Sequence, residues 1–107
     1  MSNLGEETRR KVLSHGYELE DIDYVGVIGV EWWGPHDFFR MADEIDYDNG
    51  YGWQEINPEL YVMMNDDGSW FAREEYDGSE WWRHMERPMK PWRQKHATKS
   101  KILVDID

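Results

Sequence analysis

Two Asp-Gly turns divide the middle of the chain into three short segments that favour β-structure. The segments are rich in aromatic and aliphatic side chains and span residues 59–65, 69–76 and 80–85. Asp67-Gly68 and Asp77-Gly78 connect them. This dipeptide favours tight hairpin turns because glycine adopts a positive φ without steric cost and aspartate tolerates it. The spacing therefore predicts a three-stranded antiparallel meander, which restricts the fold to classes built on such a sheet.

The segments before the meander predict one further strand and two short helices. Residues 4–15 follow a capping Asn3, carry acid-before-base pairs at i,i+4 spacing and end at Gly16, as is typical of a short helix. Residues 22–33 carry apolar side chains on both faces, which predicts one central strand covered on both sides. Pro35 suits the first turn of a second helix. The predicted fold is α+β: a small antiparallel sheet, made of the central strand and the meander, with one or two short helices.

Length and aromatic content indicate one folded domain. The chain has 107 residues, no cysteine and 15% aromatic residues, among them seven tryptophans. Disordered acidic chains are poor in aromatic residues, so the composition favours a packed core. The lack of cysteine excludes thiol nucleophiles, iron–sulfur clusters and cysteine-based zinc sites. The chain has neither a secretory signal pattern nor an apolar stretch long enough to cross a bilayer, so we expect a cytoplasmic protein.

Charge is divided unequally along the chain. The sequence has 23 acidic and 12 basic residues, for a formal net charge of −11. Residues 12–71 contain fourteen acids and one base, Arg40, whereas residues 87–101 contain six bases and no acid. We therefore expect an acidic α+β domain over residues 1–86 and a basic C-terminal segment over residues 87–107 that could end in a strand.

The acidic charge restricts the partners of the domain. An acidic body repels phosphate backbones and acidic lipid surfaces, so direct binding of nucleic acid or of a membrane is not expected. Basic partners are favoured instead, including the basic surfaces of nucleic-acid-binding proteins. Solubility is an alternative explanation of the same charge, because net charge governs association rather than fold.

One acidic cluster is similar to a calcium-binding loop in the spacing of its carboxylates. Four acids occupy the first, third, fifth and twelfth positions of such a loop: Glu44, Asp46, Asp48 and Glu55. Gly50 falls at the seventh position rather than the sixth, which weakens the match to calcium. The alternative is a turn whose carboxylates bind local backbone N–H groups. No other cofactor is predicted.

The tryptophans are the most unusual feature of the composition. Trp32-Trp33 and Trp81-Trp82 are adjacent pairs, and neighbours in a strand point to opposite faces. Each pair can place one ring in the core and one on the other face. Exposed rings would form an aromatic patch like those at binding sites, whereas a covering element would make them core. The residues predicted for partner binding are Tyr51, Trp53, Glu74, Asp77, Trp82 and His84.

Part of the sequence resembles small acidic proteins of actinobacterial phages, a group with no established activity. The similarity covers residues 39–88 and is carried by residues 46–52 (DYDNGYG), 60–62 (LYV) and 75–82 (EYDGSEWW). The last block is the most specific. The resemblance implies a phage protein that acts inside a bacterium, and it implies no chemistry.

Three functional hypotheses are compatible with these patterns. The first is a non-catalytic phage-type protein that binds and modulates a host protein through an acidic and aromatic surface, with nucleic-acid mimicry as one form of that binding. The second is a small calcium-binding or hydrolytic protein that uses the carboxylates of residues 46–55. The third is a ligand-binding module with exposed tryptophan platforms. We expect the first, because it accounts for the charge, the small size and the missing catalytic motifs.

Overall fold

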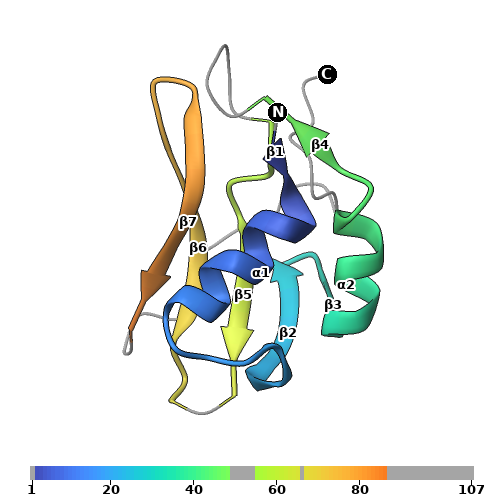
Figure 1. Ribbon diagram of the computed structural model, residues 1–107, viewed down its shortest axis with the longest axis vertical. Coiled ribbons are helices and arrows are strands. Elements are labelled where there is room, and N and C mark those ends of the chain that lie inside the picture. Colours follow the sequence, from blue (N-terminus) through green and yellow to red (C-terminus); the bar gives the residue numbers. More distant parts are fainter. Residues whose placement is uncertain (1, 49–54, 66, 87–107) are drawn as a thin grey trace.

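The computed structural model describes residues 2–48, 55–65 and 67–86, and these form an α+β fold (Figure 1). An antiparallel five-stranded sheet has the strand order β3-β2-β5-β6-β7. Its strands are β2 (Ile22–Val27), β3 (Glu31–Trp33), β5 (Leu60–Met64), β6 (Trp70–Tyr76) and β7 (Ser79–Met85). The short strands β1 (Ser2–Asn3) and β4 (Asp46–Tyr47) pair separately. The helices are α1 (Leu4–Ser14), α2 (Pro35–Ala42) and the 3-10 helix η1 (Leu19–Asp21). The strand expected near the C-terminus lies outside the described residues.

The meander predicted from the two Asp-Gly turns is confirmed. β5, β6 and β7 pair in order, and Arg73 lies opposite Trp82 across the last pair. Asp77 and Gly78 have φ values of 55° and 88°. Both central residues of a type I′ turn require such positive values, so this turn connects the two strands without splaying them. The turn thereby fixes which residues of β7 face the core.

The single strand predicted over residues 22–33 is wrong, because the chain reverses within it. β2 and β3 form an antiparallel hairpin in which Val25 lies opposite Trp33 and Gly26 opposite Trp32. Gly29 lies between the two strands with a φ of 74°, which only glycine adopts without strain. β2 nevertheless lies inside the sheet, between β3 and β5. Both of its faces are covered as expected, since Val25 lies in one apolar cluster and Tyr24 packs against another.

The first helix begins and ends where the sequence predicts. Asn3 Oδ1 accepts a hydrogen bond from the Glu6 backbone N–H at 2.9 Å, which caps the first turn. Beyond the other end, Gly16 has a φ of 87°. A Cβ at Gly5 would overlap the Asp43 carboxylate just after α2, so glycine permits the close approach of the two helices. No helix among the described residues is long and apolar enough to cross a membrane.

Two apolar clusters lie on opposite faces of the sheet. Both helices cover the same face (Figure 1), and the main core lies beneath them. Its largest buried side chains include Leu4, Phe38, Tyr47, Ile56, Phe71 and Trp82. The smaller cluster contains Ile28, Tyr61, Met63 and Trp70. Because side chains alternate along a strand, Trp70 and Phe71 place neighbouring rings in different clusters.

Candidate interaction surface

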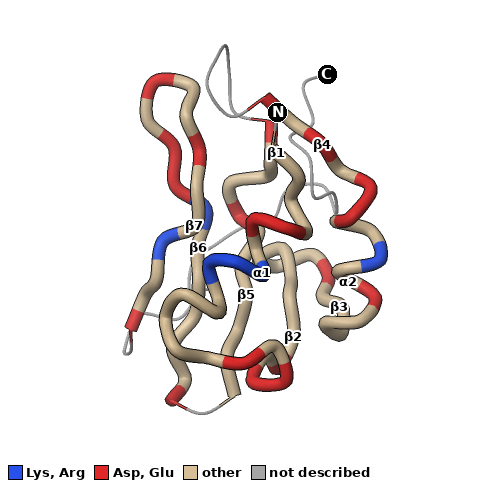
Figure 2. The backbone as a smooth tube through the Cα atoms, viewed as in Figure 1, with Lys and Arg blue, Asp and Glu red and all other residues tan. Residues whose placement is uncertain are grey.

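Acidic side chains dominate the part of the chain that the structure describes (Figure 2). That part includes twenty of the 23 acids and six of the twelve bases, for a net charge of −14. Five of the six bases form ion pairs with carboxylates: Arg9, Arg10, Arg40, Arg73 and Arg83. These pairs neutralise most of the positive charge, so the unpaired surface charge is almost entirely negative.

The acids are spread over several places rather than gathered on one face. Figure 2 shows them at the tip of the β6–β7 hairpin, at the start of α1, along the segment from the end of α2 through β4, and around η1, among others. The hairpin tip and η1 lie at opposite ends of the molecule (Figure 1). Among the described residues the carboxylates therefore form no single regular row like the phosphates of a nucleic acid.

The tip of the β6–β7 hairpin carries an exposed aromatic ring between acids. Tyr76 is 77% exposed, and Asp77 next to it is exposed at the first position of the turn. Glu75 accepts a hydrogen bond from the turn backbone at 2.7 Å, and Glu74 pairs with Arg83 at 3.2 Å. These local bonds fix the shape of the turn, while Tyr76 and Asp77 remain available to a partner.

Tyr76 is a surface residue that the sequence prediction misses. The predicted partner-binding set contains its neighbours Glu74 and Asp77, whereas the sequence predicts Tyr76 only as a strand residue. Alternation along β6 could have identified it, because residues 74 and 76 lie on the face opposite to the buried Arg73. Alternation alone is a weak signal when the strand register is unknown, because a register shift of one residue would turn Tyr76 toward the core.

A buried arginine anchors the base of the same hairpin. The Arg73 side chain is fully buried, and its Nη2 donates to Tyr47 Oη at 3.0 Å and to Glu80 Oε1 at 3.2 Å. The guanidinium carbon lies 4.8 Å from the centre of the Trp82 ring. Glu80 also accepts the backbone N–H groups of residues 55 and 56. Burial raises the pKa of Tyr47, which keeps its hydroxyl neutral. The network therefore joins the hairpin to the body.

His84 lies in a polar cluster between the end of α1 and the β5–β6 turn. Its Nε2 is 3.3 Å from Tyr17 Oη, and its ring centre is 4.8 Å from that of His15. Tyr17 Oη also donates to Asp67 at 2.8 Å and lies 2.7 Å from Ser69 Oγ. Burial, then the nearby His15, lowers the pKa of His84, while hydrogen bonds from Ser69 lower the pKa of Asp67 to about 2. Ser69 is only 2% exposed, so it is not an accessible nucleophile.

The structure brings only part of the predicted partner-binding set together at the surface. Glu74 and Asp77 lie on the β6–β7 hairpin, and His84 is half-buried on β7. Trp82 is 1% exposed and packs in the main core, so its ring is not available to a partner. The register of the hairpin is the reason, since it turns Trp82 toward α1. Tyr51 and Trp53 lie outside the described residues.

The predicted calcium ligands do not gather into a cluster in the described part of the chain. Within residues 2–48, 55–65 and 67–86, no group of three or more His, Asp or Glu side chains is placed to hold a metal ion. Asp46 Oδ1 accepts a hydrogen bond from Asn3 Nδ2 at 2.9 Å, next to the pairing of β1 with β4. Glu44 and Asp48 are exposed, and Glu55 is half-buried near β7. The loop residues 49–54 lie outside the described part.

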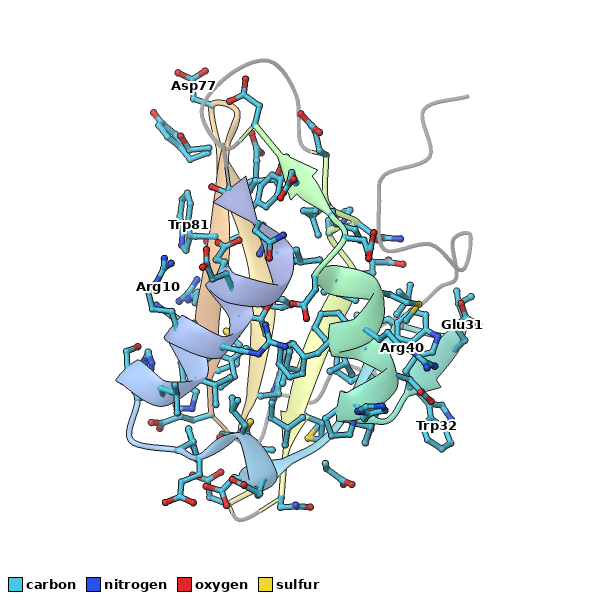
Figure 3. All side chains as sticks on the ribbon, turned by 45° about the vertical axis from the view of Figure 1, so that its right-hand side comes forward. Arg10, Glu31, Trp32, Arg40, Asp77 and Trp81 are labelled. Atoms are coloured by element: carbon cyan, nitrogen blue, oxygen red, sulfur yellow. The ribbon has the colours of Figure 1, made fainter. Side chains whose placement is uncertain are left out.

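The two adjacent tryptophan pairs each divide between a more exposed and a more buried ring, as predicted. Trp32 is 68% and Trp81 is 39% exposed, whereas Trp33 is half-buried and Trp82 is buried. Figure 3 shows Trp32 on β3 and Trp81 on β7, at opposite edges of the sheet. Four strand spacings, about 19 Å, separate these edges. The two exposed rings therefore do not form one shared platform.

Comparison with known proteins assigns no family to the chain. No protein-family model matches it, and neither a curated protein nor a solved structure does so. The function of the chain is therefore inferred from the charge, the exposure and the geometry of its side chains.

Proposed function

We propose that this protein binds a basic host protein through the acidic tip of its β6–β7 hairpin and modulates that protein without catalysing a reaction. The observation that carries the proposal is Tyr76, a ring 77% exposed beside Asp77 on a turn held by local hydrogen bonds. Exposed tyrosines are frequent anchors at protein interfaces, because they bury a large area at low entropic cost. The surrounding carboxylates supply the preference for a basic partner.

The negative charge of the surface as a whole also favours a basic partner. The described residues have a net charge of −14, and most of their bases are paired. The electric field of this negative charge extends about 8 Å at physiological salt. It attracts a basic surface before contact and so raises the association rate. Binding is therefore expected to weaken as salt is added.

The resemblance of residues 39–88 to actinobacterial phage proteins gives the proposal its biological setting. A host protein in the bacterial cytoplasm is the proposed partner, and its basic surface is the proposed contact. Nucleic-acid mimicry is not part of this proposal, because the acids of the described residues are spread over several separate places.

The test compares two double variants with the same chemical change at opposite ends of the molecule. Glu75→Gln with Asp77→Asn removes two charges from the hairpin tip, and asparagine tolerates the positive φ of the turn. Glu20→Gln with Asp23→Asn removes two charges near η1, where both side chains are exposed. Tyr76→Ala tests the aromatic ring separately.

Each immobilised protein is incubated with an actinobacterial lysate at low salt and at about 0.5 M salt, where the screening length is a few ångströms. We expect a basic protein that the wild type and the η1 variant retain at low salt, and that the hairpin variant and Tyr76→Ala lose. Equal retention by both double variants, or retention of acidic proteins only, would contradict the proposal.

A further inference from the structure

A cavity of about 250 Å³ lies between α1 and β7, at the edge of the sheet. The side chains that line it come from these two elements: Glu7, Arg10, Lys11, Ser14, Trp81 and Trp82. Figure 3 shows Arg10 and Trp81 at the same edge of the molecule. We call this cavity the α1–β7 groove. Its residues differ from those of the hairpin tip, so it is a separate site.

The two cations of the groove are the least neutralised bases of the described residues. Arg10 approaches Glu6 only to 3.8 Å, and both side chains are more than 70% exposed, so this pair contributes little. Lys11 has no ion pair within the described part of the chain. The remaining bases approach carboxylates to between 2.7 and 3.2 Å: Arg9, Arg40, Arg73 and Arg83. In an otherwise acidic surface, Arg10 and Lys11 therefore offer positive charge to a ligand.

The aromatic part of the groove combines a fixed floor with an open ring. Trp82 Nε1 donates to Thr8 Oγ1 at 2.8 Å, which fixes the buried ring at the floor. Trp81 is 39% exposed, and it stacks on no other ring or cation among the described residues. Its face is thus open to a planar ligand.

The one carboxylate in the lining does not cancel the positive charge. Glu7 Oε1 lies 3.6 Å from Arg73 Nη1 and accepts a hydrogen bond from the Tyr47 hydroxyl. Arg73 lies on the core side of the groove and is shared between Glu7 and Glu80, so it offsets the charge of Glu7 only in part. The lining still carries two cations, Arg10 and Lys11, against one carboxylate, so the groove presents a net positive charge.

We propose that the α1–β7 groove binds a small aromatic anion, with its ring stacked on Trp81 and its anionic group between Arg10 and Lys11. Its volume lies just below the range of about 300–1,000 Å³ for pockets that hold drug-sized ligands, which suits one ring system with a charged substituent. A nucleoside monophosphate and an aromatic carboxylate share this chemistry. The acidic body repels such anions at long range, but salt screens that repulsion beyond about 8 Å, whereas the groove cations act in contact.

The test follows the tryptophan indole N–H signals by NMR during titration, at about 0.15 M salt. Adenosine 5′-monophosphate and indole-3-carboxylate are the two probes, and the Trp81→Ala spectrum assigns the signal of interest. We expect saturable shifts of the Trp81 signal with at least one probe. Binding of the nucleotide alone identifies a nucleotide ligand, and binding of the carboxylate alone identifies an aromatic acid. Adenosine lacks the anionic group and ribose 5-phosphate lacks the aromatic ring. Each should therefore bind on the order of tenfold more weakly than the nucleotide.

Matched variants separate this groove from nonspecific binding. Trp81→Ala, followed through the indole signal of Trp82 in the same groove, and the double variant Arg10→Gln with Lys11→Gln should each weaken binding on the order of tenfold. Trp32→Ala removes a ring that is even more exposed, at the other sheet edge, and should leave the affinity unchanged. The proposal is overturned if neither probe shifts the Trp81 signal at about 10 mM, a concentration that detects millimolar affinity. Equal losses in Trp81→Ala and Trp32→Ala would overturn it as well.

Discussion

Trp81 and Trp82 are neighbours on β7, yet their surroundings differ. Trp82 is 1% exposed, contacts the Arg73 guanidinium and donates a hydrogen bond to Thr8 on α1. Trp81 is 39% exposed and lines the α1–β7 groove. The alternation of a strand produces this difference from two identical side chains. One ring therefore contributes to stability and the other is available for binding.

Trp82→Ala should lower the free energy of unfolding by about 3–5 kcal/mol, because it leaves a large cavity and removes the hydrogen bond to Thr8. Trp81→Ala is the matched control at the next position and should have a much smaller effect. Urea unfolding followed by circular dichroism measures both. Small and equal losses at the two positions would show that the register of the β6–β7 hairpin is wrong.

His84 should make stability depend on pH. Its pKa is lowered in the folded protein, first by burial and then by His15, whereas in the unfolded chain it stays near 6.5. As the pH falls below about 6.5, the unfolded chain takes up the proton first, so the free energy of unfolding decreases until the pH passes below the folded pKa. Above about pH 6.5 the full stability is present.

Melting temperatures recorded between about pH 7.5 and pH 5 measure this dependence, a range in which Asp67 stays ionised because its pKa is about 2. His84→Gln should flatten the decrease, and His36→Gln on the exposed side of α2 should not change it. A decrease of the same size in His84→Gln would assign the effect to another group.

At the scale of elements, the β6–β7 hairpin is stable at its base and accessible at its tip. The ion pair of Arg73 with Glu80 has no exposed side-chain surface, and Glu80 binds the backbone of residues 55 and 56. Tyr76 and Asp77 at the other end face solvent. A partner that binds the tip would therefore contact a preformed turn, which reduces the entropic cost of association.

Arg73→Met should destabilise the fold by about 3–5 kcal/mol, because it leaves the Glu80 carboxylate buried without its countercharge. Adding Glu80→Gln removes that charge while an amide oxygen can still accept a backbone N–H. The double variant should therefore be more stable than Arg73→Met alone. A double-mutant cycle in urea measures the coupling, and simple additivity of the two effects would contradict a coupled pair.

The elements that the sequence predicts well are those with a local chemical signal. The meander has Asp-Gly at its turns, and α1 has a capping asparagine before it and a glycine after it. The β2–β3 reversal was missed because Gly29 has no aspartate or asparagine before it and the apolar residues continue on both sides. Apolar alternation then resembles one long strand.

The contacts of the candidate sites were less predictable, because they join distant parts of the sequence. Arg73 binds Tyr47 across 26 residues, and α1 meets β7 only in the folded chain. Glu74 and Asp77 of the predicted partner-binding set lie on the β6–β7 hairpin, whereas the sequence pattern identifies neither Tyr76 nor the α1–β7 groove. Trp82 belongs to the predicted partner-binding set although it is buried, because the alternation leaves two registers open until packing selects one.

Mutual repulsion of the acidic side chains across the protein should limit its stability at low salt. The protein has a formal net charge of −11, and such excess charge favours the expanded chain. The melting temperature should therefore rise between about 10 mM and about 300 mM sodium chloride, as the screening length falls from about 30 Å to below 10 Å. Differential scanning calorimetry measures this shift.

The η1 variant with Glu20→Gln and Asp23→Asn is the control for this effect. It should melt at a higher temperature than the wild type at low salt, and the difference should shrink as salt is added. A melting temperature that falls with salt in the wild type would instead show that the ion pairs of Arg9, Arg40 and Arg83 outweigh the repulsion.

The hydrogen bond from Trp82 to Thr8 spans 74 residues and has a consequence for the order of synthesis. α1 leaves the ribosome early, but the strand against which it packs follows near the end of the described part of the chain. Until β7 emerges, the main core that contains Leu4 and Val12 lacks Trp82, one of its largest buried side chains. Completion of the main core is therefore expected only after nearly the whole domain has been translated, so a ribosome that stalls before β7 would hold a nascent chain with exposed apolar surface.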